Sequence, residues 1–198
     1  RGIPQTDLQG ISAPRHQTAR GGTAVQITMT LNGKKIKDNI DADMLLIDLL
    51  RDHGCFSVKR GCETSNCGLC TVFMDEKPVL SCSVLAVRAD GHDIRTLEGL
   101  QDEAAGFIGF IADQGADQCG FCNPGFVMNT IALLREIPDP TDDEIRAFLA
   151  GNLCRCSGYE GQLRGIRAYL DARRSAARPD DDISGKSEKP GKSGKENA

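Results

Sequence analysis

One stretch of the sequence, GCETSNCGLC at residues 61–70, gathers three cysteines in a single loop, and a fourth follows after eleven intervening residues. These four are Cys62, Cys67, Cys70 and Cys82. Their spacing is typical of thiolates that hold a [2Fe–2S] cluster, whereas zinc sites more often show two closely spaced pairs. Gly61 and Gly68 allow the backbone to turn closely around a cluster and to present N–H donors to its sulfides. The stretch therefore predicts a small domain built around a [2Fe–2S] loop.

A second group of four cysteines lies further along the chain, as CGFC at residues 119–122 and CRC at residues 154–156. This group consists of Cys119, Cys122, Cys154 and Cys156. Four thiolates with this spacing can hold either zinc or a second iron–sulfur cluster, and the spacing alone leaves both open. The ninth cysteine, Cys55, is left over, and we expect it to be a small buried apolar residue.

The composition excludes several classes of protein. Nine cysteines are an odd number, and no charged segment followed by an apolar stretch marks export, so a disulfide framework is not expected. With 24 Lys+Arg against 28 Asp+Glu, the net charge is −4, which gives no basic surface for nucleic acid or anionic lipid. The apolar run at residues 44–47 is far shorter than the ~20 residues that cross a bilayer. We expect a cytoplasmic protein without a membrane span.

The sequence contains no motif for a nucleotide or a substrate. Neither G-x-G-x-x-G nor G-x4-G-K-S/T is present, and the three histidines (His16, His53 and His92) are scattered along the chain. No nucleophile–base arrangement and no paired carboxylates are apparent. Two redox centres without a substrate site indicate an electron relay whose reacting centres lie on other chains.

The chain divides into four regions. Residues 1–23 and 174–198 have too few large apolar side chains to fold alone, so we expect a flexible arm and a disordered charged tail. Residues 24–99 form a domain around the first cysteine group, and residues 100–173 form a helical domain that contains the second. The whole is of the α+β class.

Residues 24–99 show the pattern of a hairpin, a helix and further strands. Alternating apolar residues at 25–31 and 36–40 predict two strands joined by a type I′ turn at Asn32-Gly33. Asp43 is expected to cap a helix that Gly54 closes. Further strands are expected at residues 71–74, 79–80 and 94–97, with a turn at residues 75–78.

After residue 100 the apolar residues recur at helical spacing, and we expect four helices in a small bundle. They are expected around residues 107–114, 123–136, 141–151 and 159–173. Asn123 is expected to cap the second of these helices, with Pro124 at its first position. Thr141 and Glu144 have the spacing of a capping box.

Three runs of sequence together resemble the small iron–sulfur subunit of molybdenum hydroxylases, the family of xanthine dehydrogenase, aldehyde oxidoreductase, aerobic carbon monoxide dehydrogenase and nicotinate dehydrogenase. They are GCETSNCGLCTV at residues 61–72, QCGFCNPG at residues 118–125 and GNLCRCSGY at residues 151–159. The resemblance spans about residues 24–172. It implies a β-grasp ferredoxin domain followed by a four-helix domain, with one [2Fe–2S] cluster in each.

The resemblance also implies partners and an order of electron transfer. Electrons would pass from the molybdopterin of a large subunit through the Cys119 group, then through the Cys62 group, to the FAD of a medium-sized subunit. The complex would be a heterotrimer or its dimer. Gln118 matches the family residue that hydrogen-bonds the pterin, and Cys156 matches the ligand nearest to it.

The chain departs from the family pattern in three places. Asn123 and Ser157 each stand where the family usually has Thr, and residues 55–60 lack the common Thr-Gly pair.

A free-standing [2Fe–2S] redox sensor is the alternative function, and a structural zinc adaptor is a third. The loop around residues 62–67 is similar to the corresponding loop of carbon monoxide enzymes. Residues 119–125 are more similar to those of xanthine and N-heterocycle enzymes, and we favour a purine or another N-heterocycle as the substrate.

Overall fold

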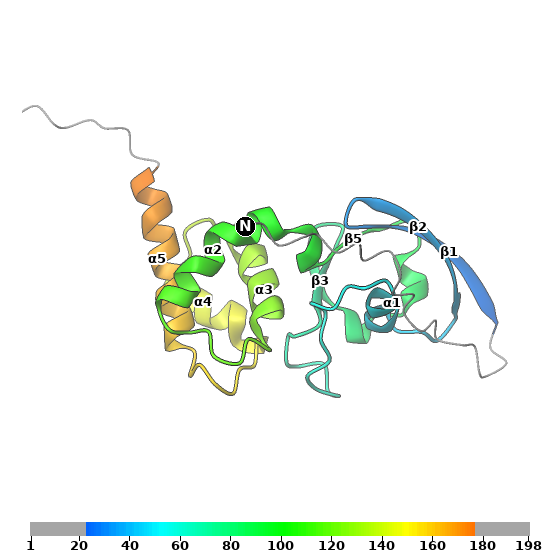
Figure 1. Ribbon diagram of the computed structural model, residues 1–198, viewed down its shortest axis with the longest axis horizontal. Helices are drawn as coiled ribbons and strands as arrows, with labels where there is room; N and C mark the ends of the chain where they lie inside the picture. The colour runs from blue at the N-terminus through cyan, green and yellow to red at the C-terminus, as the bar shows by residue number, and fades with distance from the viewer. Residues whose placement is uncertain (1–22, 177–198) are drawn as a thin grey trace, which may run out of the picture.

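The structure is a computed structural model, and it describes residues 23–176. A mixed sheet with one α-helix makes up one half, and four further α-helices make up the other, side by side (Figure 1). The flexible arm expected at residues 1–23 lies outside the described residues except for Thr23, and so does most of the charged tail. The expected start of the tail is wrong, because Arg174–Ala176 belong to the last helix.

The sheet begins with the predicted hairpin. Strands β1 (Ala24–Leu31) and β2 (Lys34–Asp41) pair antiparallel along their whole length. Asn32 and Gly33 have φ angles of 49° and 78°, as the two central residues of a type I′ turn require. The predicted turn is confirmed.

The strand order of the sheet is β2-β1-β5-β3-β4. The remaining strands are β3 (Thr71–Met74), β4 (Lys77–Leu80) and β5 (Asp93–Arg95). The pairing of β1 with β5 is parallel, and the other pairings are antiparallel.

Two predicted boundaries in this sheet are wrong. The turn after β3 contains only Asp75 and Glu76, and Pro78 lies within β4, an edge strand, where a missing N–H is tolerated. Strand β5 ends at Arg95 rather than at Leu97. The reason is that the amide of Thr96 donates to the side-chain oxygen of Asn32 (2.9 Å) instead of continuing a ladder.

Helix α1 (Leu46–Asp52) packs on the sheet, and Gly54 follows its end with a φ of 83°. The expected cap at Asp43 is wrong, because the helix begins after Leu45, which forms a β-bridge with Leu85. The backbone of residues 44–46 is thus paired with residues 84–86 across the fold. The core of this half joins the sheet to the helix, with Ile27, Met29, Leu31, Ile40, Leu46, Ile47, Leu49, Leu50, Val72 and Ile94 among its members.

The second half contains α2 (Gln101–Asp113), α3 (Asn123–Glu136), α4 (Asp142–Phe148) and α5 (Glu160–Ala176). Short 3₁₀ segments occur at Ser81–Ser83, Ala86–Ala89, Leu97–Gly99 and Leu149–Gly151. All four α-helices contribute to one core, which includes Phe107, Ile111, Phe126, Met128, Ile131, Leu133, Ile145, Leu163, Ile166 and Leu170. Phe73 of β3 also belongs to this core, so the two halves share packed side chains.

Helix α3 has a different cap from the one expected. Cys122 is the N-cap residue, and Asn123 is already helical. The Asn123 amide instead donates to the Asp117 carboxylate (3.0 Å), which draws its side chain away from the helix end.

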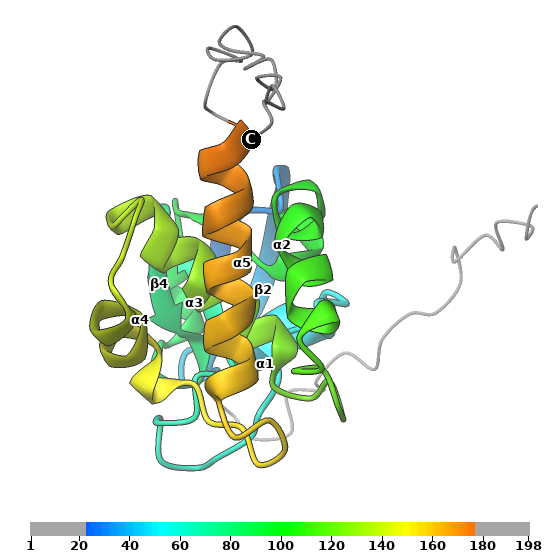
Figure 2. The same ribbon diagram turned by 90° about the vertical axis from the view of Figure 1, so that its left-hand side faces the viewer.

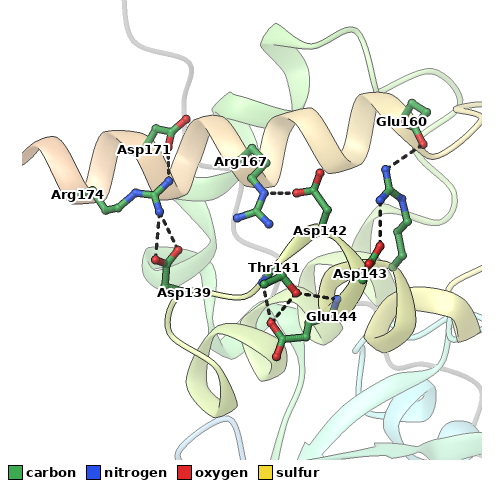
Figure 3. A network of polar contacts seen from close by, with 10 residues as sticks. Asp139, Thr141, Asp142, Asp143, Glu144, Glu160, Arg167, Asp171 and Arg174 are labelled. Atoms are coloured by element: carbon green, nitrogen blue, oxygen red, sulfur yellow. Dashed lines mark hydrogen bonds and ion pairs between the residues drawn. The ribbon is translucent and has the colours of Figure 1, made fainter.

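The capping box of α4 is confirmed. The Glu144 amide donates to the Thr141 hydroxyl, and the Thr141 amide donates to the Glu144 carboxylate (2.7 Å). Ion pairs from Arg167 to Asp142 and from Arg174 to Asp139 join this region to α5 (Figure 3).

We expect Thr141→Ala to lower the free energy of unfolding by about 1 kcal/mol, because an N-cap hydroxyl satisfies an otherwise unpaired helix amide. The loss should appear as a fall of roughly 2–4 °C in the melting temperature of the iron-loaded protein. Thr141→Ser keeps the hydroxyl and should melt like the parent. Equal melting of all three proteins would contradict a stabilising role for the cap.

Candidate metal centres

The two cysteine groups lie in different halves of the molecule, along the same edge (Figure 1). The first occupies the loop between α1 and β3 together with Cys82, and the second occupies the loops before α3 and before α5. The loops before β3 and before α5 both lie at the lower edge in the two views (Figures 1 and 2). A backbone hydrogen bond from the amide of Leu153 to the carbonyl oxygen of Cys67 (3.0 Å) joins the two sites directly.

In the first group the thiols form two pairs. The side chain of Cys62 lies beside that of Cys67, and the side chain of Cys70 lies beside that of Cys82. Cys67 and Cys70 are buried, while Cys62 and Cys82 are partly exposed. The group therefore has a buried side and an exposed side.

The loop supplies the backbone donors that thiolate ligands need. The backbone N–H groups of Asn66 and Thr64 lower the pKa of Cys62 to about 6, and the neighbouring Cys67 side chain adds to the effect. Burial raises the pKa of Cys70 to about 11, and Cys82 raises it further. A bound iron removes the thiol protons, so the buried thiols remain suitable ligands.

The second group is also divided into two pairs. Cys119 and Cys156 are exposed and their sulfurs are 3.5 Å apart, and Cys122 lies beside Cys154 further inside. The backbone N–H of Phe121 lowers the pKa of Cys119, with help from Cys156. Burial raises the pKa of Cys122 to about 12.

Both groups thus offer two pairs of thiols rather than one set of four around a point. Within residues 23–176, no three His, Cys, Asp or Glu side chains are gathered as a single metal ion would need. Two pairs suit a centre with two irons, in which four cysteines are shared between the metals. N–H donors around the thiols, such as Ser157 to the Cys154 sulfur (3.3 Å), fit the negative charge of such a cluster.

The structure brings the remaining predicted site residues together. The Gln118 side-chain amide donates to the backbone carbonyl of Cys156 (3.0 Å), and both residues are exposed. Cys55 is only 4 % exposed and lies in the core of the sheet half, which confirms the expected burial. Burial raises the pKa of the Cys55 thiol.

The sequence analysis missed the residues that surround the second group. Phe121, Leu153 and Tyr159 are exposed by 48 %, 45 % and 46 %, although large apolar side chains are usually covered. Lys59 crosses from the first half, where its ammonium donates to the Phe121 carbonyl (3.2 Å) and lies 4.9 Å from the centre of its ring. The position of Phe121, Leu153 and Tyr159 close to Cys119, Cys122 and Cys154 in the sequence could have indicated that they belong to the site.

The chain matches two family models: a 2Fe-2S iron-sulfur cluster binding domain over residues 29–101 and a [2Fe-2S] binding domain over residues 96–167. These matches define a protein with two [2Fe–2S] clusters, and they favour a cluster over zinc in the second site. None of the helices within residues 23–176 is long and apolar enough to cross a membrane.

Several characterised proteins are similar over most of their length. The nicotinate dehydrogenase small FeS subunit of Eubacterium barkeri is 43% identical over 138 residues, which cover 68% of this chain and 88% of the relative. The xanthine dehydrogenase iron-sulfur-binding subunit of Escherichia coli O157:H7 is 45% identical over 143 residues, 69% of this chain and 88% of the relative. The crystal structure of quinoline 2-oxidoreductase from Pseudomonas putida 86 has a chain with a TM-score of 0.70 and 38% identity, matched over 77% of this chain and 97% of that one.

The chain belongs to the family of small iron–sulfur subunits of molybdenum hydroxylases. It is accordingly a subunit of an oxidoreductase.

Proposed function

We propose that this chain is the electron-transfer subunit of a molybdenum hydroxylase complex. The clusters, when bound, each accept and release one electron at a time, and they connect the molybdopterin of a large subunit to the FAD of a medium-sized one. The chain's own residues hold the clusters, exclude water from one of them and present the other to the partner. The complex is a heterotrimer or its dimer in the cytoplasm.

The proposed ligands are the eight cysteines of the two groups. Cys62, Cys67, Cys70 and Cys82 hold the first cluster, and Cys119, Cys122, Cys154 and Cys156 hold the second. We assign residues 24–99 to a β-grasp ferredoxin domain and the helices that follow, up to the end of α5 at Ala176, to a four-helix-bundle domain. Two separate cores, one in each half, support this division.

The observation that carries the proposal is the exposure of the second group. Cys119 and Cys156 reach the surface and are surrounded by three exposed apolar side chains, Phe121, Leu153 and Tyr159. An exposed apolar patch around a redox centre is typical of a surface that another subunit covers. In the first group, by contrast, two of the four thiols are buried. The second group therefore suits direct contact with the molybdenum subunit.

Anaerobic reduction of the complex by its substrate, followed by electron paramagnetic resonance (EPR), tests this function. We expect two distinct [2Fe–2S] signals, both of which appear on the timescale of turnover. A free-standing redox sensor, the alternative function, would give a chain that purifies without partners and that no hydroxylase substrate reduces.

The substrate proposed is a purine or another N-heterocycle. The names of the relatives support it, since nicotinate, xanthine and quinoline all contain a ring nitrogen. Steady-state assays of the purified complex with xanthine, nicotinate and an aromatic aldehyde distinguish the classes. Preferred oxidation of the aldehyde would contradict the assignment.

We expect Gln118→Ala to slow the reduction of the second cluster by substrate roughly tenfold, because one hydrogen bond toward the pterin is lost. The iron content should not change, since within residues 23–176 the Gln118 side chain hydrogen-bonds to a backbone carbonyl, that of Cys156, and not to a cysteine sulfur. Gln101→Ala, at an exposed position on α2, is the matched control and should behave like the parent. Loss of iron from Gln118→Ala would show instead that Gln118 is structural.

A further inference from the structure

We propose that the backbone contact between the two ligand loops is the bridge for electrons between the clusters, and that Gly125 is the positioning residue that keeps this bridge short. The proposal rests on the function above, in which the eight cysteines hold two clusters. Gly125 is not a proposed cluster ligand, and it is not adjacent to one in the sequence.

Within residues 23–176, one backbone hydrogen bond connects the loops of the two ligand sets. The amide of Leu153 donates to the carbonyl oxygen of Cys67 at 3.0 Å. Cys67 is itself a proposed ligand of the first cluster, and Leu153 directly precedes Cys154, a proposed ligand of the second. The path from one ligand to the other therefore consists of backbone bonds and one hydrogen bond, without a gap through space.

Gly68 permits this contact on the side of the first loop. Its φ of 72° is a conformation that side chains rarely adopt. A Cβ at this position would also lie 2.5 Å from the Asn152 amide nitrogen and 2.6 Å from the Gly151 carbonyl oxygen. The two loops approach closely because Gly68 leaves room for the side-chain amide of Asn152 and the backbone carbonyl of Gly151.

Gly125 permits the contact on the side of helix α3. A Cβ at Gly125 would overlap the carbonyl oxygen of Gly68 and would lie 2.8 Å from the Cα of Leu69. These are backbone atoms, which cannot rotate away as a side chain can. The φ of Gly125 is not positive, so the backbone conformation does not require glycine here. Alanine is the better helix former, and glycine is needed at this helical position only because there is no space for a methyl group.

The surroundings of the contact hold the two loops in place. Cys67 and Leu69 are buried, and Asn152 is only 8 % exposed. The amide of Asn129 on α3 donates to the hydroxyl of Thr71 (2.9 Å), next to the first loop. Close packing of this kind fixes the separation of the two loops.

The step itself is a one-electron exchange. The second cluster is oxidised by one electron and the first is reduced by one, and no bond or proton moves. The substrate oxidised on the molybdenum subunit supplies the electrons, and the flavin receives them.

Gly125→Ala in the whole complex tests the bridge. After anaerobic reduction by substrate, freeze-quench EPR should show the first cluster being reduced severalfold more slowly than in the parent, with unchanged iron content. The magnetic interaction between the two reduced clusters should weaken, because the added methyl group pushes the first loop away from the start of α3, which follows Cys122. This second readout does not depend on turnover.

Two glycines on other helices provide matched controls. Gly106→Ala on α2 adds a methyl group where nothing lies within 4 Å. Gly165→Ala on α5 adds one 2.5 Å from the Ile111 side chain and 3.1 Å from the Phe110 carbonyl oxygen, a crowded site away from the loops. Both variants should keep the parent's transfer rate and magnetic interaction, although the second should be less stable.

Asn152→Ala provides an independent variant, because it loosens the same contact by removing volume instead of adding it. Should Gly125→Ala lose iron, slower transfer in Asn152→Ala supports the bridge and an unchanged rate overturns it. Unchanged transfer and magnetic interaction in an iron-replete Gly125→Ala also overturn it. A parent complex without two reducible clusters would instead contradict the proposed function.

Discussion

Cys119→Ser is expected to reduce turnover with any flavin-side acceptor to background. Cys119 lies at the surface with its sulfur 3.5 Å from that of Cys156, so its loss breaks the exposed pair of the second group. The first group lies in another loop with its own backbone donors and should keep its cluster. Iron analysis should show half the parent content, and EPR after dithionite reduction should show only the first cluster's signal.

Cys55→Ser is the matched control for this substitution. It replaces the same atom at a buried position outside both groups, where the side chain faces the Asn32 amide. It should retain both clusters and full turnover. Normal turnover in a Cys119→Ser variant that has lost the second cluster would contradict the order of transfer.

Cys70→Ser is expected to remove the first cluster and to leave the second in place. Cys70 is 2 % exposed and pairs with Cys82, so its replacement removes the first cluster. Substrate should still reduce the second cluster within one turnover, because the molybdenum side of the relay is intact. Reduction of the flavin should fall to background.

The measurement is stopped-flow absorbance of the anaerobic complex mixed with substrate, with the flavin and iron–sulfur bands followed separately. The Cys70→Ser trace should show reduction of one cluster and then stop. Flavin reduction at the parent's rate would mean that electrons bypass the first cluster. Together, the two variants establish which cluster comes first.

Local interactions made part of this fold predictable from sequence. The Asn32-Gly33 turn depends on two residues that favour positive φ, and the Thr141–Glu144 capping box depends on groups three residues apart. Each structure is determined within a few residues of the chain. A single sequence therefore indicated both correctly.

The wrong predictions involve partners distant in sequence. Asp43 is a suitable cap by type, but the backbone that follows it pairs with residues 84–86, and the helix starts later. Asn123 is another suitable cap, yet Asp117 binds its side chain. The end of β5 is determined by the side chain of Asn32, more than sixty residues earlier.

The candidate metal centres were likewise predictable only as far as local sequence determines them. The spacing of the cysteines indicated which four belong to each group, and the structure shows how each group separates into pairs. The contact between the loops could not be predicted, because Gly125 is recognisable as a packing residue only when Gly68 is seen against it. The exposed patch at Phe121, Leu153 and Tyr159 likewise depends on two loops, those before α3 and before α5, meeting at one surface.

Native mass spectrometry of the protein purified from its source without oxygen tests the central claim most directly. We expect one assembly that contains a molybdopterin-binding chain, a flavin-binding chain and this chain with the mass of two [2Fe–2S] clusters. Identification of the largest chain would also indicate the substrate class. A lone chain with two clusters, or a chain whose mass fits zinc in the second site, would contradict the claim.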